Sequence, residues 1–247
     1  MTIKIISIVL MITLMFSSTC LAEEFVIGMS EAFKPYNYIE NHKWIGIDVE
    51  IANEAFKRLG VKVEYREFPW ARVLKMAETG DIDGVLSVYC NDKRPFLENT
   101  YEQSYSVKIS FFSQKRKHAK ITGIHDFDGT SVGVNRGNYY AKYIDTYTGI
   151  EKFESIDVKM LLRPLNANRI DFALHEVGPF LYYSKELGFE GRFEAVYDLK
   201  QDSVCMAFSK AALGTQSKMW SDKVSKIVLQ LKDEGFIQKV VDTYLPK

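Results

Sequence analysis

The sequence predicts an α/β protein built from two similar lobes, and three observations lead to this prediction. In the first half, apolar runs alternate with amphipathic stretches in the order β-α-β-α-β, which builds a mainly parallel sheet covered by helices. The same alternation returns after residue 130. Finally, residues 80–87 resemble residues 168–175, and each segment follows a predicted helix and leads into a predicted strand.

The elements of the first half take their limits from caps and from the spacing of apolar residues. Asp48 is a suitable N-cap for a helix with apolar residues at helical spacing, and Gly60 ends that helix. Pro69 opens a second helix, which Gly80 closes. The expected order is a strand at 25–28, a helix at about 48–59, a strand at 61–65, a helix at 69–80 and a strand at 82–89.

The second half repeats this pattern and then adds two helices. Gly188 is the expected stop of the helix that begins near residue 177. The expected order is a strand at 131–134, helices at about 138–147 and 157–167, a strand at 170–174, and helices at about 177–187, 221–234 and 236–244.

The two similar segments place Ser87 and His175 at equivalent carboxyl ends of strands. Ligands of open α/β sheets bind outside these strand ends. The sequence therefore predicts a ligand site where the two halves face each other.

The first 22 residues have the pattern of a cleaved signal peptide. Lys4 precedes an apolar run at residues 5–16, which is shorter than the roughly 20 apolar residues that span a bilayer. We expect cleavage after Ala22 and a soluble, periplasmic mature protein. Cys20 leaves lipid anchoring open as an alternative, although the residues before it lack the usual lipobox pattern.

The composition argues against nucleic acid as a partner, because 32 Lys and Arg residues balance 32 Asp and Glu residues. Beyond Cys20 the chain has two cysteines, Cys90 and Cys205. Export permits a disulfide, but the spacing alone cannot pair the two. We expect two buried thiols, since free Cys packs as a small apolar group.

Seven short motifs follow each other along the chain. They are Pro35-Tyr36, GIDVEIA at 46–52, PWAR at 69–72, GDID at 80–83, Lys93-Arg94, DFDGTSVGV at 126–134, and an ending that begins LKDEG at 231 and finishes Tyr244-Leu245. In their order and spacing these motifs resemble the family 3 extracellular solute-binding proteins, the polar amino-acid binders of ABC transport systems. The resemblance covers nearly all of the mature chain.

This resemblance implies the bilobal periplasmic-binding-protein fold, of Venus-flytrap type II, with two mixed sheets and two hinge crossovers. The crossovers are expected near residues 106–112 and 197–205. Lobe one would comprise residues 23–108 plus 203–247, and lobe two residues 109–202. Two short crossovers form a hinge, so the lobes are expected to close around a ligand.

The resemblance also assigns ligand contacts in lobe one. Arg94 matches the arginine that holds the ligand carboxylate, and a guanidinium can donate two parallel hydrogen bonds to it. Ser87 matches a pocket residue whose hydroxyl can donate one more. Trp70, Phe33 and Tyr36 match the aromatic residues that flank the ligand.

In lobe two, the turn after the strand at 131–134 is expected to contact the ligand. Asn138 and Tyr139 match small polar residues of the family, although Tyr139 is much larger. Gly137 before a helix lets backbone N–H groups approach an anion, and Arg136 adds a second cation.

His175 departs from the family, which usually has an Asp here to pair with the ligand α-ammonium. A neutral imidazole cannot offset a buried ammonium as a carboxylate does. Either Glu176 takes this role, or the ligand lacks an α-amino group. Together with Arg94 and Arg136, this favours an acidic or non-amino-acid ligand.

The function expected is capture of a small, polar, carboxylate-bearing ligand for an ABC importer, by a monomer without cofactor, metal or catalytic residues. One alternative is an enzyme on the same fold, similar to cyclohexadienyl dehydratases, with His175 and Glu176 as acid and base. Against it, the sequence has no nucleophile elbow, phosphate loop or zinc-type histidine spacing. A second alternative is a sensory protein that docks on a membrane receptor rather than a permease.

Overall fold

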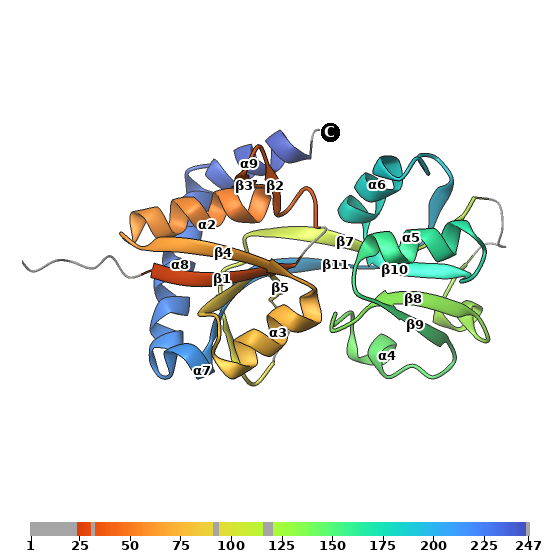
Figure 1. The fold of residues 1–247 in the computed structure, drawn as a ribbon, viewed down its shortest axis with the longest axis horizontal. Helices are drawn as coiled ribbons and strands as arrows, with labels where there is room; N and C mark the ends of the chain where they lie inside the picture. Colours follow the sequence, from red (N-terminus) through yellow and green to blue (C-terminus); the bar gives the residue numbers. More distant parts are fainter. Residues whose placement is uncertain (1–23, 31–32, 91–93, 116–120, 246–247) are drawn as a thin grey trace, which may run out of the picture.

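The computed structural model describes residues 24–30, 33–90, 94–115 and 121–245. Two groups of helices and strands lie side by side and are bridged by two long strands, β7 (Tyr105–Gln114) and β11 (Phe193–Ser209) (Figure 1). The expected signal peptide lies outside the described residues, so cleavage after Ala22 and anchoring at Cys20 stay predictions. Within the described ranges, no helix is long and apolar enough to cross a membrane.

Lobe one combines the N-terminal elements with the C-terminal helices. Its elements are β1 (Glu24–Ser30), β2 (Tyr38–Glu40), β3 (Lys43–Ile45), α2 (Ile47–Arg58), β4 (Lys62–Phe68), α3 (Trp70–Thr79), β5 (Gly84–Tyr89), β6 (Leu97–Asn99), α7 (Lys210–Leu213), α8 (Gln216–Asp233) and α9 (Phe236–Tyr244). Lobe two contains the 3-10 helix η1 (Ile124–Phe127), β8 (Ser131–Asn135), α4 (Lys142–Asp145), β9 (Glu151–Ser155), α5 (Val158–Asn166), β10 (Phe172–Glu176) and α6 (Val177–Glu186).

The predicted two-lobed α/β fold is confirmed, but one continuous sheet runs through both lobes in place of two separate sheets. Its strands follow the order β4-β1-β5-β11-β7-β10-β8-β9, and β6 also pairs with β11. Pairing is parallel within each lobe away from the hinge and antiparallel at β7 and β11. The sheet is continuous because β7 and β11 pair with each other over the whole length of β7, from Tyr105 to Gln114.

Each lobe buries both faces of its inner strands, as β5 in lobe one and β10 in lobe two show, whereas the edge strand β9 is largely exposed. In lobe one, Phe25 of β1 packs against Trp220 of α8 with ring centroids 4.7 Å apart. In lobe two, the neighbouring residues Phe111 and Phe112 of β7 point to opposite faces. Phe111 stacks on Phe127 at 4.1 Å, and Phe112 stacks on Phe180 at 3.8 Å.

Helix α2 has Gly46 as its N-cap and no side-chain cap, so the prediction that Asp48 caps this helix is wrong. Gly46 has a φ of +122°, and a Cβ there would lie 2.4 Å from the backbone oxygen of Tyr36. Glycine is required at this close approach. Asp48 instead falls in the first turn and turns its carboxylate into the lobe, where only 4% of the residue is exposed.

The prediction of a helix at about 138–147 is wrong in its limits, because only the four residues of α4, Lys142–Asp145, are helical in this segment. The carboxylate of Asp145 accepts hydrogen bonds from the backbone N–H groups of Tyr140 (3.3 Å) and Ala141 (3.1 Å). These bonds hold the chain before α4 outside the helix. The result is an extended loop between β8 and α4 that faces lobe one.

Cys90 and Cys205 form a disulfide, with an S–S distance of 2.00 Å and Cα atoms 5.1 Å apart, so the expectation of two free thiols is wrong. The pairing of β5 with β11 brings them together. Cys205 lies opposite Val88, and the backbone N–H of Cys90 donates to the oxygen of Ser203 at 2.9 Å.

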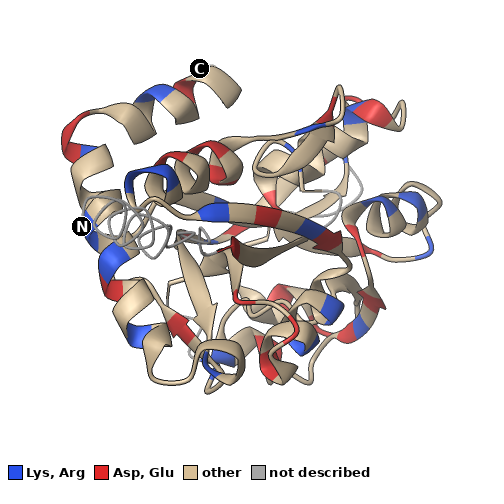
Figure 2. Ribbon diagram, turned by 60° about the vertical axis from the view of Figure 1, so that its left-hand side comes forward, with Lys and Arg blue, Asp and Glu red and all other residues tan. Residues whose placement is uncertain are grey.

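Charges of both signs are interspersed on the same elements, as Figure 2 shows. Arg66, for example, lies 2.7 Å from Glu64 on β4, and Arg58 of α2 lies 2.6 Å from Glu234 at the end of α8. This mixture differs from the basic stripe that is typical of nucleic-acid-binding proteins.

Candidate functional site

A small cavity, the cleft cavity, lies between the lobes where the ends of β5 and β10 meet. Its volume of about 30 Å³ gives room for about two water molecules. The lobes contact each other around it, since Arg94 Nη2 donates to the backbone oxygen of Gly137 at 2.6 Å and Lys34 Nζ donates to the hydroxyl of Tyr182 at 3.0 Å. The lining residues are Ser30, Phe33, Trp70, Ser87, Tyr89, Asn135, Asn138, Tyr139 and Glu176.

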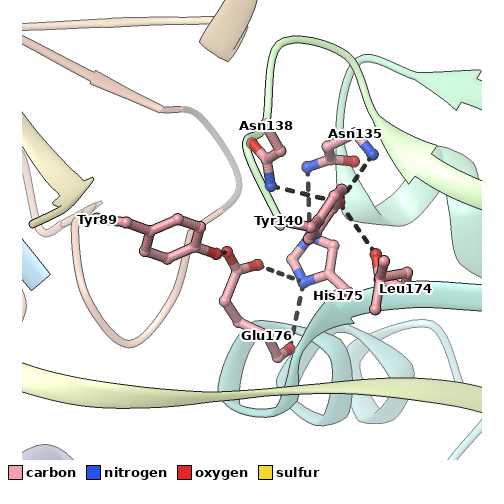
Figure 3. Close-up of polar contacts among 7 residues, drawn as sticks. All are labelled: Tyr89, Asn135, Asn138, Tyr140, Leu174, His175 and Glu176. Atoms are coloured by element: carbon pink, nitrogen blue, oxygen red, sulfur yellow. Dashed lines mark hydrogen bonds and ion pairs between the residues drawn. The ribbon is translucent and has the colours of Figure 1, made fainter. Parts of the chain in front are cut away.

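Glu176 supplies the carboxylate of this cavity, at the end of β10 and immediately before α6 (Figure 3). The residue is only 3% exposed. Its Oε1 accepts a hydrogen bond from the hydroxyl of Tyr89, which reaches across from lobe one. Its Oε2 lies 3.0 Å from Nδ1 of His175 but makes no aligned hydrogen bond.

His175 lies behind Glu176 and not among the residues that line the cavity. It is 1% exposed, and its Nε2 lies 3.3 Å from Nδ2 of Asn135. An amide nitrogen donates, so this contact assigns the ring proton to Nδ1, on the side of Glu176. Asn135 thereby orients His175, whose Nδ1 also lies 3.2 Å from the backbone oxygen of Glu176.

The surroundings of Glu176 favour its ionised form. Burial by itself raises the pKa of this carboxyl group, but the neighbouring His175 and the hydrogen bond from Tyr89 outweigh burial, so the pKa lies below its ordinary value. A carboxylate held ionised in a closed cavity is suited to a cationic partner.

A second buried carboxylate lies beneath the cavity in lobe one. Asp48 accepts hydrogen bonds from the hydroxyls of Tyr105 (2.7 Å) and Ser87. Because the Ser87 proton is directed at Asp48, this hydroxyl faces a ligand only as an acceptor, and it already accepts from Asn37 at 3.2 Å. Burial raises the pKa of Asp48 from 3.8 to about 6, although these hydrogen bonds oppose the rise.

Aromatic side chains form the remaining walls. Trp70 from the start of α3 is 7% exposed and lines the cavity together with Phe33, Tyr89 and Tyr139. Lys200 of β11 lies behind two of these rings, with Nζ 5.2 Å from the Tyr89 centroid and 5.8 Å from that of Tyr139. The walls can therefore cover an apolar stem or face a cation.

Besides His175, three further residues expected in the site lie outside the cleft cavity. Tyr36 is buried against Tyr105 with stacked rings 5.3 Å apart. Arg136 is exposed and lies 3.0 Å from Glu154. Arg94 lines a neighbouring hollow of about 260 Å³, the side pocket, which shares Asn135, Asn138 and Tyr139 with the cleft cavity.

Sequence reasoning missed Tyr89 and Asn135, which shape the acidic end of the cavity. A signal for Tyr89 was present, because alternate residues of a strand share a face and Tyr89 follows Ser87 by two. Asn135 carried no such signal. Among the described residues, no group of three or more His, Cys, Asp or Glu side chains is arranged to hold a metal ion.

Comparison with known proteins gives concordant matches. The chain is 21% identical to the arginine-binding extracellular protein ArtP of Bacillus subtilis (strain 168), over 88% of this chain and 84% of that protein. The substrate-binding protein of an amino acid ABC transporter has the same fold, with a TM-score of 0.75, 20% identity and coverage of 91% of this chain and 100% of that one.

A histidine kinase sensor domain with similarity to periplasmic binding proteins also shares the fold, with a TM-score of 0.80, 20% identity and coverage of 91% of this chain and 97% of that one. The family model described as bacterial extracellular solute-binding proteins, family 3, matches residues 25–247. The chain therefore belongs to the family 3 extracellular solute-binding proteins.

Proposed function

We propose that this protein captures a small amino acid with a cationic group between its lobes and delivers it to an ABC importer. The observation that carries the proposal is the buried, ionised Glu176 in an aromatic-walled cavity at the lobe junction. The names of the matched relatives, an arginine-binding protein and an amino-acid ABC binding protein, support the same class of ligand. Arg136 gives no support to an acidic ligand, because its side chain pairs with Glu154 on the surface.

In this proposal Glu176 takes the role that the family gives to the residue at His175. Its Oε2 makes no hydrogen bond, and Oδ1 of Asn135 is likewise buried without a partner among the described residues. Buried acceptors of this kind call for N–H donors. An ammonium or guanidinium group supplies both the donors and the opposite charge.

Arg94 is the proposed partner of the ligand carboxylate. Burial lowers the pKa of its guanidinium, while Asp145 opposes this, and the group faces the side pocket. The side pocket and the cleft cavity meet at Asn135, Asn138 and Tyr139. A ligand whose cation contacts Glu176 could therefore extend its carboxylate toward Arg94.

The rest of the functional setting follows from the family. We propose residues 1–22 as a cleaved signal peptide, a periplasmic location and a monomer that binds rather than transforms its ligand. The lobes would divide near residues 109 and 202, inside β7 and β11, so closure would bend these two strands.

The test of Glu176 compares Glu176→Gln with Glu186→Gln, a surface variant of the same lobe whose carboxylate pairs with Lys159. L-arginine and L-lysine should raise the melting temperature of the wild type and of Glu186→Gln, since a ligand stabilises the form that it binds. In Glu176→Gln we expect titration calorimetry to show affinity lower by about tenfold to a hundredfold, the contribution of a hydrogen bond to a charged group. Equal affinity in both variants would remove Glu176 from the site.

A second variant, Arg94→Lys, keeps the positive charge but removes the planar fork. We expect affinity for an amino acid to fall by about tenfold in calorimetry, because a single ammonium replaces two parallel N–H donors. The amine made by removing the carboxylate, agmatine in the case of arginine, is the matched control ligand. Its affinity should be the same in wild type and variant, and an equal loss for both ligands would contradict the assigned role.

A further inference from the structure

The acidic end of the cleft cavity already holds a donor from the opposite lobe. Tyr89, the last residue of β5, is 7% exposed and donates its hydroxyl to Oε1 of Glu176, the last residue of β10 (Figure 3). We propose that Tyr89 is a specificity-determining residue, whose hydroxyl satisfies Glu176 until a ligand cation with N–H groups takes its place. This inference rests on the proposed function of Glu176.

The acceptors around Tyr89 define the ligand that can replace it. Loss of the Tyr89 hydrogen bond leaves a buried carboxylate short of one donor, which is costly unless the newcomer donates in turn. A primary ammonium or a guanidinium has enough N–H groups for Glu176 and for the unpartnered Oδ1 of Asn135. A quaternary ammonium has none, although the aromatic walls would attract its charge.

The backbone that carries Tyr89 is fixed to lobe one at several points. The next residue, Cys90, is tied to β11 by the disulfide with Cys205. Asn99 Nδ2 donates to the backbone oxygens of Tyr89 (3.4 Å) and Cys90 (3.3 Å). The ammonium group of Lys200, which belongs to the hinge strand β11, lies 5.2 Å from the centroid of the Tyr89 ring.

Because this backbone belongs to lobe one and the ring is buried at the junction with lobe two, we expect exchange of its hydroxyl for a ligand to require the two lobes to separate. The Tyr89–Glu176 hydrogen bond thus adds to the Arg94–Gly137 and Lys34–Tyr182 contacts between the ligand-free lobes, and it is lost when a ligand enters. Ligand binding replaces one hydrogen bond to the same carboxylate by another, so the affinity reflects the difference between the two donors.

The first arm of the experiment needs no ligand. Small-angle X-ray scattering compares wild type, Tyr89→Phe and the control Tyr65→Phe, which loses a tyrosine hydroxyl bonded to Asn53 on lobe one. We expect a larger radius of gyration for Tyr89→Phe, and equal values for the wild type and Tyr65→Phe. Circular dichroism confirms that all three proteins are folded.

The second arm uses a matched pair of ligands, L-lysine and its Nε-trimethyl derivative. We expect the wild type to bind L-lysine at least tenfold more tightly than the trimethyl form, and Tyr89→Phe to bind L-lysine about tenfold more tightly than the wild type does, because no internal donor has to be displaced. Equal radii of gyration, equal affinity of the wild type for the two ligands, or unchanged or weaker binding of L-lysine by Tyr89→Phe would overturn the inference.

The variant Glu176→Gln distinguishes a failure of the proposed function from a failure of the role inferred for Tyr89. If this variant keeps the wild-type affinity for L-lysine, the proposed function fails. If it loses that affinity while Tyr89→Phe behaves as the wild type in both arms, Glu176 remains the cation partner and only the role of Tyr89 is rejected.

Discussion

The double variant Cys90→Ser/Cys205→Ser should lose about 4–5 kcal/mol of unfolding free energy relative to the oxidised wild type. The disulfide joins residues 115 positions apart, and a cross-link over so long a loop removes much of the conformational entropy of the unfolded chain. For a protein of this size, such a loss lowers the melting temperature by about 10–20 °C. Urea unfolding followed by circular dichroism measures the difference.

The wild type under a reducing agent is the matched control for this variant. We expect the reduced wild type and the double variant to unfold at the same urea concentration, well below the oxidised wild type. If the oxidised wild type and the double variant unfolded together, the disulfide would not stabilise the folded chain.

The Asp48→Asn variant should remove a pH dependence of stability from the wild type. Burial raises the pKa of Asp48 from 3.8 to about 6, so between these values the folded protein binds a proton that the unfolded chain has lost. The contribution of Asp48 is therefore fully present below pH 4 and is lost as the pH rises through 6. A pKa rise of this size corresponds to roughly 3 kcal/mol.

The measured quantity is the unfolding free energy of Asp48→Asn minus that of the wild type, from urea titrations at pH 4 and pH 7. We expect this difference to increase by about 3 kcal/mol across the interval. Asp198→Asn serves as the control that should stay nearly flat, because hydrogen bonds from Lys108 and Ser110 lower the pKa of Asp198 and its titration in the folded protein then lies below pH 4. A flat or falling difference for Asp48→Asn would show that the carboxylate does not titrate in this window.

Local signals in the sequence predicted the elements that depend on local chemistry. Helix α3 lies between Pro69 and Gly80 as expected, with Gly80 in the left-handed conformation, and α9 has the expected limits. The lengths of β7 and β11 could not be predicted in this way. Their pairing joins Phe193 to Gln114, and no periodicity within either segment reveals a partner so far along the chain.

The location of the site could be predicted from the sequence, because the site lies at the ends of two strands that the sequence identifies. The similarity of residues 80–87 and 168–175 led to the junction of β5 and β10, and Glu176 was named as a possible cation partner. Tyr89 was overlooked because an aromatic residue at a strand end resembles ordinary core. Its contact with Glu176 forms only when the two lobes come together in the folded protein. The positions of Arg94 and Arg136 relative to the cavity depend on the same packing of the lobes, so the sequence could not predict them either.

The central position of β11 in the sheet has a consequence for how the chain is made. Phe25, almost the first described residue, packs on Phe208 and Trp220, which come almost two hundred residues later. During synthesis from the amino end, the edge of β5 therefore stays unpaired and Phe25 stays uncovered until the whole of lobe two has been made. An unpaired edge and a bare apolar face invite association with other chains. The half-finished lobe, and not the mature protein, is then the form that most needs a chaperone during biogenesis.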